Sequence, residues 1–92
     1  MKQCVQIMLS IALRQAMLKK YIQESAQQSG IEGMAFIRDP DNIKIVANGA
    51  SAAIDEFIDL LYIGSGKLRP ETVTVEPFPQ SKDFRGVFRV IE

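Results

Sequence analysis

Three cations lie close together in the stretch IALRQAMLKK, where Arg14, Lys19 and Lys20 stand among leucine, alanine and methionine. Such side chains bind phosphate and other small anions, arginine through a planar fork and lysine as a point charge. Any anion site must be local, because eleven basic residues balance eleven acidic ones along the chain. A chain of zero net charge lacks the broad positive field of nucleic-acid-binding proteins, so we expect no nucleic-acid partner.

The other residues that could do chemistry are few. The chain has no histidine, which excludes a histidine-dependent nucleophilic triad and leaves general-base work to a carboxylate or a positioned water. The single cysteine, Cys4, cannot form an intrachain disulfide, and we expect it to serve as a small apolar side chain. Asp39 and Asp41 flank Pro40, where carboxylates are usually turn formers. We therefore expect no metal site and no cofactor.

The composition is that of a globular domain. With 92 residues, 47% of them hydrophobic and 24% charged, we expect one domain over residues 1–92. Residues 4–18 are too short and too interrupted by polar side chains to span a membrane, so we expect no membrane partner. A secretory signal is disfavoured because Arg14 follows the apolar run without a small-x-small cleavage pattern. One cysteine suits a reducing compartment, and we expect a cytoplasmic protein.

Two different periodicities meet inside the cationic stretch. Before it, apolar residues occupy every second position, which predicts a strand with one buried face: Val5, Ile7, Leu9, Ile11 and Leu13. After it, apolar and small residues recur every three or four positions, which predicts an amphipathic helix: Leu18, Tyr21, Ile22, Ser25, Ala26 and Ser29. Gly30 should end this helix. The cations would then lie at a joint, with the strand ending at 11–13 and the helix beginning at 18–20.

The rest of the chain predicts a hairpin, a second helix and two strands. Short strands at 34–37 and 43–47 flank the turn sequence DPDN. The second helix, opened by Gly49 and ended by GSG, carries an apolar stripe: Ile54, Phe57, Ile58 and Leu61. Residues 72–76 alternate valine with polar residues and predict a strand, which Pro77 and Pro79 confine to an edge or an end. Residues 84–91 predict a short closing strand.

This order of elements is the split βαβ pattern. We therefore expect an α/β (α+β) fold, a ferredoxin-like βαββαβ sandwich. Its antiparallel or mixed sheet would carry two helices on one face and a short extra C-terminal strand. The fold by itself says little about function.

The segment SGIEGMAFIRDPDNIKIVANGASAAIDEFIDLLYIGS resembles the middle section of the acylphosphatases. The resemblance lies in glycines and apolar spacing: Gly30, Ile31, Gly33, Ile43, Ile45, Gly49, Phe57, Leu61 and Gly64. TVTVEPF and DFRGVFRV look like the last two strands of that family, and Val5 falls at its first-strand valine. The resemblance implies a fold of acylphosphatase type and, for the family, hydrolysis of carboxyl-phosphate anhydrides.

The chain departs from that family at the positions that carry catalysis. Acylphosphatases hold phosphate with a Val-Gln-Gly-Val-x-Phe-Arg loop, and an asparagine on the next strand positions the attacking water. Counting from Gly30, the arginine position carries Lys19 and the asparagine position carries Ile37. The loop positions, residues 13–18, read LRQAML and contain no glycine. Moving Arg14 onto the arginine position would shorten the strand, lengthen the helix and leave Ile37 unchanged.

Two functions follow from this comparison. The first is an acylphosphatase-like domain without acylphosphatase activity that acts as a small binding or interaction module. The second is an active acyl-phosphate hydrolase in which Lys19 or Arg14 holds phosphate. Arg14 and Lys19 are therefore candidate ligands for a small phosphate-type anion. The plainer interpretation is that both are solvated charges at the ends of a strand and a helix.

A second group of apolar residues lies opposite the predicted core positions: Met8, Ala12, Val46 and Ile37 or Phe36. If both helices cover one side of the sheet, these side chains emerge on the other. An apolar sheet face suggests a protein partner or self-association, although scattered apolar groups are also normal on surfaces. As a group, the methionines Met8, Met17 and Met34 are expected to fill the core rather than to form a binding surface.

Overall fold

The computed structural model describes residues 2–12, 14–37, 39, 41–64, 69–78 and 85–91, without the side chains of residues 2 and 15. Its elements are β1 (Lys2–Ser10), α1 (Gln15–Ser29), β2 (Glu32–Phe36), β3 (Ile43–Ala50), α2 (Ser51–Ile63), β4 (Thr72–Pro77) and β5 (Phe88–Ile91). This is the predicted βαββαβ order with β5 as the extra C-terminal strand. The expected α+β sandwich is confirmed.

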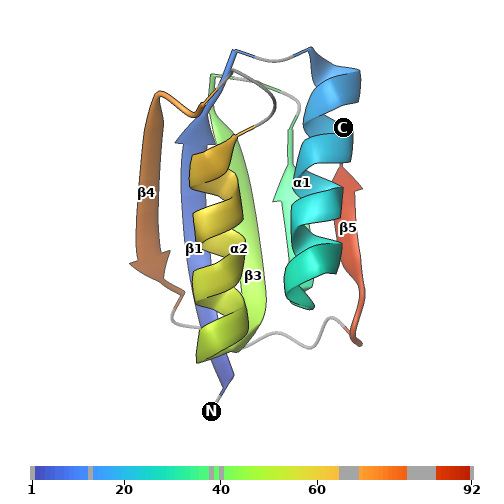
Figure 1. The fold of residues 1–92 in the computed structure, drawn as a ribbon, viewed down its shortest axis with the longest axis vertical. Helices are drawn as coiled ribbons and strands as arrows, with labels where there is room; N and C mark the ends of the chain where they lie inside the picture. Colours follow the sequence, from blue (N-terminus) through green and yellow to red (C-terminus); the bar gives the residue numbers. More distant parts are fainter. Residues whose placement is uncertain are drawn as a thin grey trace.

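The strands form one five-stranded mixed sheet in the order β4-β1-β3-β2-β5. The β1–β3, β1–β4 and β2–β3 pairs are antiparallel, whereas β5 lies parallel to β2. Both helices pack on the same face (Figure 1), so the other face carries no helix. The β4 strand forms one edge, in agreement with the constraint that Pro77 places on pairing.

The core lies between the helices and the sheet. The predicted stripes of both helices are buried apart from the half-buried Ile58. Ile7, Leu9 and Ile11 are buried on the opposite side of the core, as the alternation in the sequence predicts. The Phe57 ring of α2 packs against the Phe88 ring of β5 with 5.8 Å between centroids. The apolar core therefore reaches from β1 to the C-terminal strand.

The joint between β1 and α1 differs from the prediction. The strand ends at Ser10, and α1 begins at Gln15 rather than at residues 18–20. Residues 15–18 are Gln, Ala, Met and Leu, all good helix formers, and neither glycine nor proline stops the helix from extending toward its N-terminus. Gly30 ends the helix as predicted, in the left-handed conformation at φ 75°. The predicted strand residue Leu13 lies outside the described residues.

Other predicted boundaries move or cannot be placed. The strand predicted at 34–37 is β2, Glu32–Phe36, so it begins and ends earlier. The β3 strand continues to Ala50, so α2 begins at Ser51 rather than at Gly49. The closing strand β5 is shorter than predicted, because residues 85 and 86 form a turn with φ of 54° and 72°. The predictions for Pro40, Pro79, residues 65–66 and residue 84 fall outside the described part of the chain.

The hairpin turn forms as predicted, with two hydrogen bonds that use Asp39 as acceptor. The Asn42 N–H donates to the Asp39 carbonyl at 3.0 Å, and the Asp41 N–H donates to the Asp39 carboxylate at 3.0 Å. Beyond the turn, β2 and β3 lie unusually close at Gly33. A Cβ at Gly33, whose φ is 150°, would lie 2.0 Å from the Val46 carbonyl oxygen. Glycine is needed here because any side chain would collide with the β3 backbone.

One buried hydroxyl joins the two helices. The Tyr21 hydroxyl of α1 donates a hydrogen bond to the Leu61 carbonyl of α2. Desolvation by burial raises the pKa of this tyrosine from 10.0 to about 12. The side chain is therefore protonated at neutral pH and can act as the donor.

Candidate functional site

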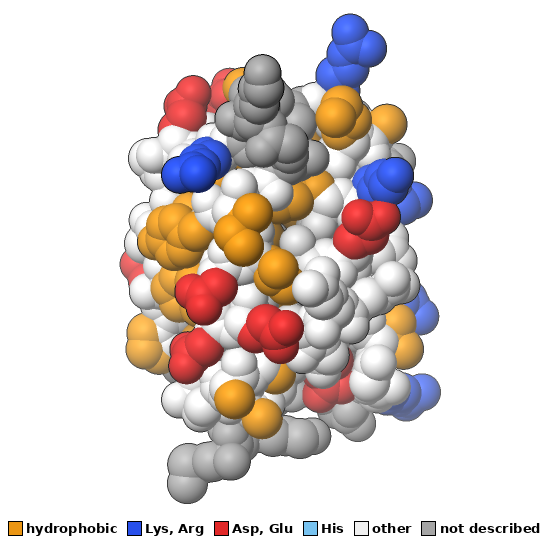
Figure 2. Space-filling model, viewed as in Figure 1, with side chains coloured by type: hydrophobic (Ala, Val, Ile, Leu, Met, Phe, Trp, Pro, Cys, Tyr) orange, Lys and Arg blue, Asp and Glu red, His pale blue; other side chains and the backbone are white. Residues whose placement is uncertain are grey.

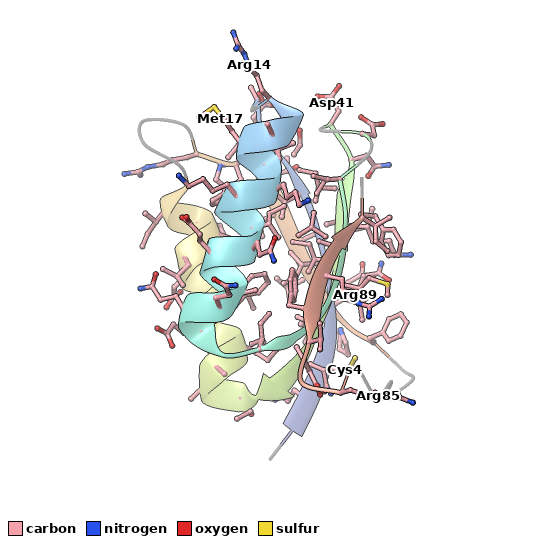
Figure 3. All side chains as sticks on the ribbon, turned by 90° about the vertical axis from the view of Figure 1, so that its right-hand side faces the viewer. Cys4, Arg14, Met17, Asp41, Arg85 and Arg89 are labelled. Atoms are coloured by element: carbon pink, nitrogen blue, oxygen red, sulfur yellow. The ribbon has the colours of Figure 1, made fainter. Side chains whose placement is uncertain are left out.

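Arg14 lies at the N-terminal end of α1 and points away from the fold (Figure 3). It is the N-cap residue, with φ −64° and ψ 150°, and its exposed side chain makes no capping hydrogen bond. Helical hydrogen bonding begins with the Leu18 N–H, which donates to the Arg14 carbonyl at 2.9 Å. Residues 15–18 therefore form the first turn of a helix.

This first turn determines which backbone groups the joint presents. A phosphate cradle needs several backbone N–H groups that converge on one anion. The Leu18 N–H makes the first hydrogen bond inside the helix, and the residues before it, 15–17, precede that bond. The shorter strand and longer helix are those expected with Arg14, rather than Lys19, at the arginine position. Lys19 is exposed and lies one turn further along α1. Residues five apart do not share a helix face, since only neighbours three or four apart do. The structure thus brings Arg14 and Lys19 to the same end of the molecule without directing them to a common point.

Ile37 follows β2 and is fully buried in the core. Its N–H donates to the Ile91 carbonyl at 3.0 Å, which ties the end of β2 to β5. A buried side chain without polar atoms cannot orient a water molecule. Ile37 also does not lie on the open sheet face, because its neighbour Phe36 takes that position with 40% of its surface exposed.

The end of the molecule with Arg14 also carries the hairpin turn, and Figure 3 shows Arg14 and Asp41 projecting there. Asp39 and Asp41 are both exposed, and their hydrogen bonds lie within the turn. In the described part of the chain, no three histidine, cysteine or acidic side chains come together as a metal site would require. The Asp39 carboxylate acts as the turn former that the sequence predicts, and Asp41 takes part through its backbone N–H.

The open sheet face, the face of the sheet without helices, presents its side chains in rows that follow the strand register. One row across the sheet from β4 to β5 contains Thr74, Met8, Lys44, Phe36 and Ile91. Met8, Phe36 and Ile91 expose between 37% and 40% of their surface. The row thus combines three exposed apolar side chains with one central cation.

The adjacent row contains Glu76, Gln6, Val46, Met34 and Arg89. Figure 3 shows Arg89 on the side of the sheet away from the helices. Val46 keeps only 7% of its surface exposed, since its longer row neighbours flank it. The prediction of an apolar open face is therefore right for Met8 and Phe36, while Val46 is largely covered; Ala12 is exposed just beyond β1.

The prediction that Met8, Met17 and Met34 fill the core is wrong for all three, since Met34 is half-buried in a row of the open sheet face. Met8 is 37% exposed because it occupies an even position of β1, which faces away from the helices. Met17 is 50% exposed on the first turn of α1. Cys4 is half-buried on β1, opposite Asn48 of β3.

The sequence reasoning missed a polar cluster at the opposite end of the molecule, the Glu32 cluster, formed by Glu32, Asn48 and the Gly86 backbone. Asn48 is 5% exposed, and its Nδ2 donates to Glu32 Oε1 at 2.8 Å. The other Glu32 oxygen accepts the Gly86 N–H. Hairpin register could have found the first contact, since a turn at residues 39–42 places position 32 opposite position 48.

Two shallow cavities open beside this cluster. One has a volume of about 380 Å³ and is lined in part by Glu32 and Asn48. The other, of about 460 Å³, lies against α1 and β5. They share Gly30, Ile31 and Gly86. Both Glu32 carboxylate oxygens and the Asn48 Nδ2 are bonded within the cluster, so the carboxylate holds the turn at residue 86.

The helix-covered face has a different character. Figure 2 shows acidic side chains gathered over α2, which carries the exposed residues Asp55, Glu56 and Asp59. Acidic charge on this side would repel anions that approach α2. Within the described residues, neither helix is long and apolar enough to cross a membrane.

The fold is that of the acylphosphatases. It superposes on acylphosphatase from Bacillus subtilis with a TM-score of 0.84 and 17% identity, and the match covers all of both chains. An acylphosphatase from Coxiella burnetii gives the same TM-score at 18% identity, covering 98% of this chain and 93% of the other. A full-length HypF, solved with phosphate and nucleotide bound, matches with a TM-score of 0.84 at 15% identity. Here the whole chain matches 12% of HypF.

No family model and no curated protein sequence matches the chain. The resemblance recognised in the sequence is thus supported at the level of the fold. At 15–18% identity, these similarities show the fold of the chain.

Proposed function

We propose that residues 1–92 form one acylphosphatase-like domain that acts as a binding or interaction module without acylphosphatase activity. The observation that supports this most strongly is the complete burial of the apolar Ile37 at the position of the family asparagine. It holds whether Lys19 or Arg14 stands at the arginine position. The single cysteine is compatible with the cytoplasmic location that we also propose.

The chemistry of the Ile37 side chain carries this proposal. Acylphosphatases use an asparagine at this position to orient the attacking water, whereas Ile37 is apolar and fully buried. Substitution of Lys19 by arginine alone would therefore not supply the side chain that orients the attacking water.

The surface that we propose for binding is the open sheet face. It presents Met8, Phe36 and Ile91 as exposed apolar groups around the cations Lys44 and Arg89. Apolar groups interspersed with arginine are typical of protein interfaces. A protein partner with apolar and acidic side chains would complement this face.

Hydrolysis of an aryl acyl phosphate such as benzoyl phosphate tests the proposal. We expect the rate to equal that of the uncatalysed reaction at high protein concentration. A double Arg14→Ala, Lys19→Ala variant is the matched control, and it should give the same rate. Turnover by the unmodified chain that disappears in this variant would establish the alternative function, an active acyl-phosphate hydrolase.

Anion binding without turnover is tested separately with inorganic phosphate. In an NMR titration, a retained anion site would shift the amide signals of residues 14–20, and the shifts would be lost in Arg14→Ala. We expect no saturable shifts in that segment. Saturable shifts without hydrolysis would extend the binding function to a small phosphate-type anion.

A further inference from the structure

The outer edge of β4 has no partner among the described strands. The strand pairs with β1 on its inner side only. Figure 1 shows β4 beside the helices rather than beneath them, because α2 lies over β1 and β3. As a result, Val75 faces the helix side of the sheet yet exposes 39% of its surface.

The register of β4 on β1 determines which backbone groups point outward. The Phe78 N–H donates to the Cys4 carbonyl at 3.0 Å, which marks this pair as hydrogen-bonded. Hydrogen-bonded and non-bonded pairs alternate along an antiparallel ladder. The backbone groups of Thr72, Thr74 and Glu76 therefore point to β1, and those of Val73, Val75 and Pro77 point outward.

Pro77 fits this assignment, since it stands where the ladder with β1 needs no N–H. The outward donors along β4 are consequently the N–H groups of Val73 and Val75. Both residues lie in the sequence TVTV, which is uncharged and has high β propensity.

The two edges of the sheet differ in protection. Natural sheets protect their edges with short strands, charged side chains or proline. The β5 edge is only four residues long and carries Arg89. The β4 edge is six residues long, and its Glu76 and Pro77 come only after the uncharged segment 72–75. That segment is therefore open to a further strand.

We propose that a second copy of this chain pairs with the β4 edge, β4 against β4 in antiparallel orientation, about a two-fold axis at Thr74. Val73 of each copy would exchange both backbone hydrogen bonds with Val75 of the other. The two sheets would join into one continuous sheet with helices on the same face.

The side chains favour a second copy in this register. Val73 and Val75 would lie beside each other on the helix side, and the two Thr74 residues would pair on the open face, both favourable cross-strand combinations of β-branched residues. A shift in one direction would place Pro77, which has no N–H, opposite Val73. A shift in the other would place Glu71 opposite Val75, and the Glu71 N–H already donates to the Ser10 carbonyl at 2.7 Å.

Sedimentation equilibrium of the full chain tests this pairing. We expect the average mass to rise with concentration toward twice that of the monomer. Val75→Pro should remove the rise, because it deletes an outward N–H without deleting any hydrogen bond to β1. Val75→Thr keeps both the N–H and the branched side chain, and it should still dimerise. Circular dichroism checks that both variants remain folded.

Amide hydrogen exchange provides a second measurement that needs no variant. In the monomer, the Val73 and Val75 amides should exchange faster than those of Thr74 and Glu76. Protection at Val73 and Val75 should rise with protein concentration.

Two results would overturn the pairing. The first is a monomer at every concentration, and the second is a dimer that Val75→Pro leaves intact. In the second case, loss of the dimer in Phe36→Ser would assign self-association to the open sheet face. The β4 edge and that face are separate surfaces, so failure of the edge pairing leaves the proposed function standing.

Discussion

The two ends of the sheet differ in the exposure and hydrogen bonding of their polar groups. Where α1 begins, Arg14 projects into solvent and Ile37 is buried without a polar atom, although the resemblance to the acylphosphatases implies that family's phosphate loop and asparagine position there. At the opposite end, Glu32 accepts hydrogen bonds from the Asn48 side chain and the Gly86 backbone. The hydrogen bonds of the Glu32 cluster thus lie at the end of the sheet for which the resemblance implies no catalytic residue.

This difference distinguishes hydrogen bonds that stabilise the fold from polar groups that a catalytic site would use. The Glu32 cluster connects β2, β3 and the turn before β5, so its hydrogen bonds hold strands that are distant in sequence. At the end with Arg14, the described contacts between distant segments are backbone ones, such as that from the Ile37 N–H to the Ile91 carbonyl, and the short joint between β1 and α1 connects neighbouring elements. Substitutions at the two ends should therefore have different consequences.

The largest effect is expected at Gly33, beside the Glu32 cluster. In Gly33→Ala the new Cβ would lie 2.0 Å from the Val46 carbonyl oxygen, so the strands must separate. We expect a loss of about 3 kcal/mol or more in the free energy of unfolding, measured by urea denaturation. Gly30→Ala is the control, since its Cβ meets open space and only its φ of 75° is strained, at about 1 kcal/mol. Equal losses in the two variants would contradict the close approach of β2 and β3.

Ile37→Asn tests the opposite end. The substitution places an amide in a fully buried apolar site, and we expect a loss of about 3 kcal/mol in thermal or urea unfolding. Ile37→Val should cost only about 1 kcal/mol. The double variant Lys19→Arg, Ile37→Asn should hydrolyse no benzoyl phosphate. Measurable turnover in that variant would show that the joint can still open into a phosphate cradle.

Glu32→Ala measures the polar cluster itself. It leaves the Asn48 side-chain donor buried without its acceptor, which we expect to cost about 2 kcal/mol. Glu76→Ala is matched in residue type and sheet face but lies at the exposed β4 edge, and it should change stability by about 0.5 kcal/mol or less. If both variants lose the same stability, the cluster does not hold the turn before β5.

Tyr21→Phe examines a polar contact that belongs to neither end. Loss of the hydrogen bond to the Leu61 carbonyl should cost about 1 kcal/mol, because that carbonyl also accepts the Gly64 N–H at 3.2 Å. The folded pKa of about 12 exceeds the ordinary value of 10.0, so the stability of the unmodified chain should fall as pH rises from 10 to 12. The variant should lack this component. An unchanged pH profile would mean that Tyr21 is not desolvated.

Arg14→Asp should have a small effect of the opposite sign. An aspartate at the N-cap supplies the missing capping oxygen and replaces a cation at the positive end of the helix dipole, so we expect a gain of about 1 kcal/mol or less. Arg14→Ala serves as the control and should change stability little. Destabilisation by aspartate would indicate that the arginine makes a contact needed by the fold.

The sequence predicts the buried faces better than the element ends. Alternation in β1 and the helical stripes identify Ile7, Leu18 and Phe57 as core, because burial repeats with the period of each element. The start of α1 is misplaced because residues 15–17 have high helix propensity but lie before the first stripe residue, Leu18. A pattern of burial cannot report a turn that is exposed.

The candidate site is predicted less completely. The sequence shows Ile37 where the resemblance implies the family asparagine, Lys19 or Arg14 near its arginine, and no glycine in residues 13–18. The direction of the Arg14 side chain and the pairing of Glu32 with Gly86 cannot be read from it, since the latter joins residues far apart in the chain. The parallel placement of β5 beside β2 is likewise a tertiary outcome that local alternation does not contain.

That placement of β5 also sets the order in which the chain can fold. During synthesis, β2 can pair with β3 as soon as the hairpin is complete, but its other edge stays open until residues 88–91 have emerged. Closure of that long loop is entropically costly and slow compared with the hairpin. The Ile37 N–H, which bonds to Ile91, would be among the last to gain protection from exchange. Until then, the nascent chain exposes an unpaired strand beside the nascent core.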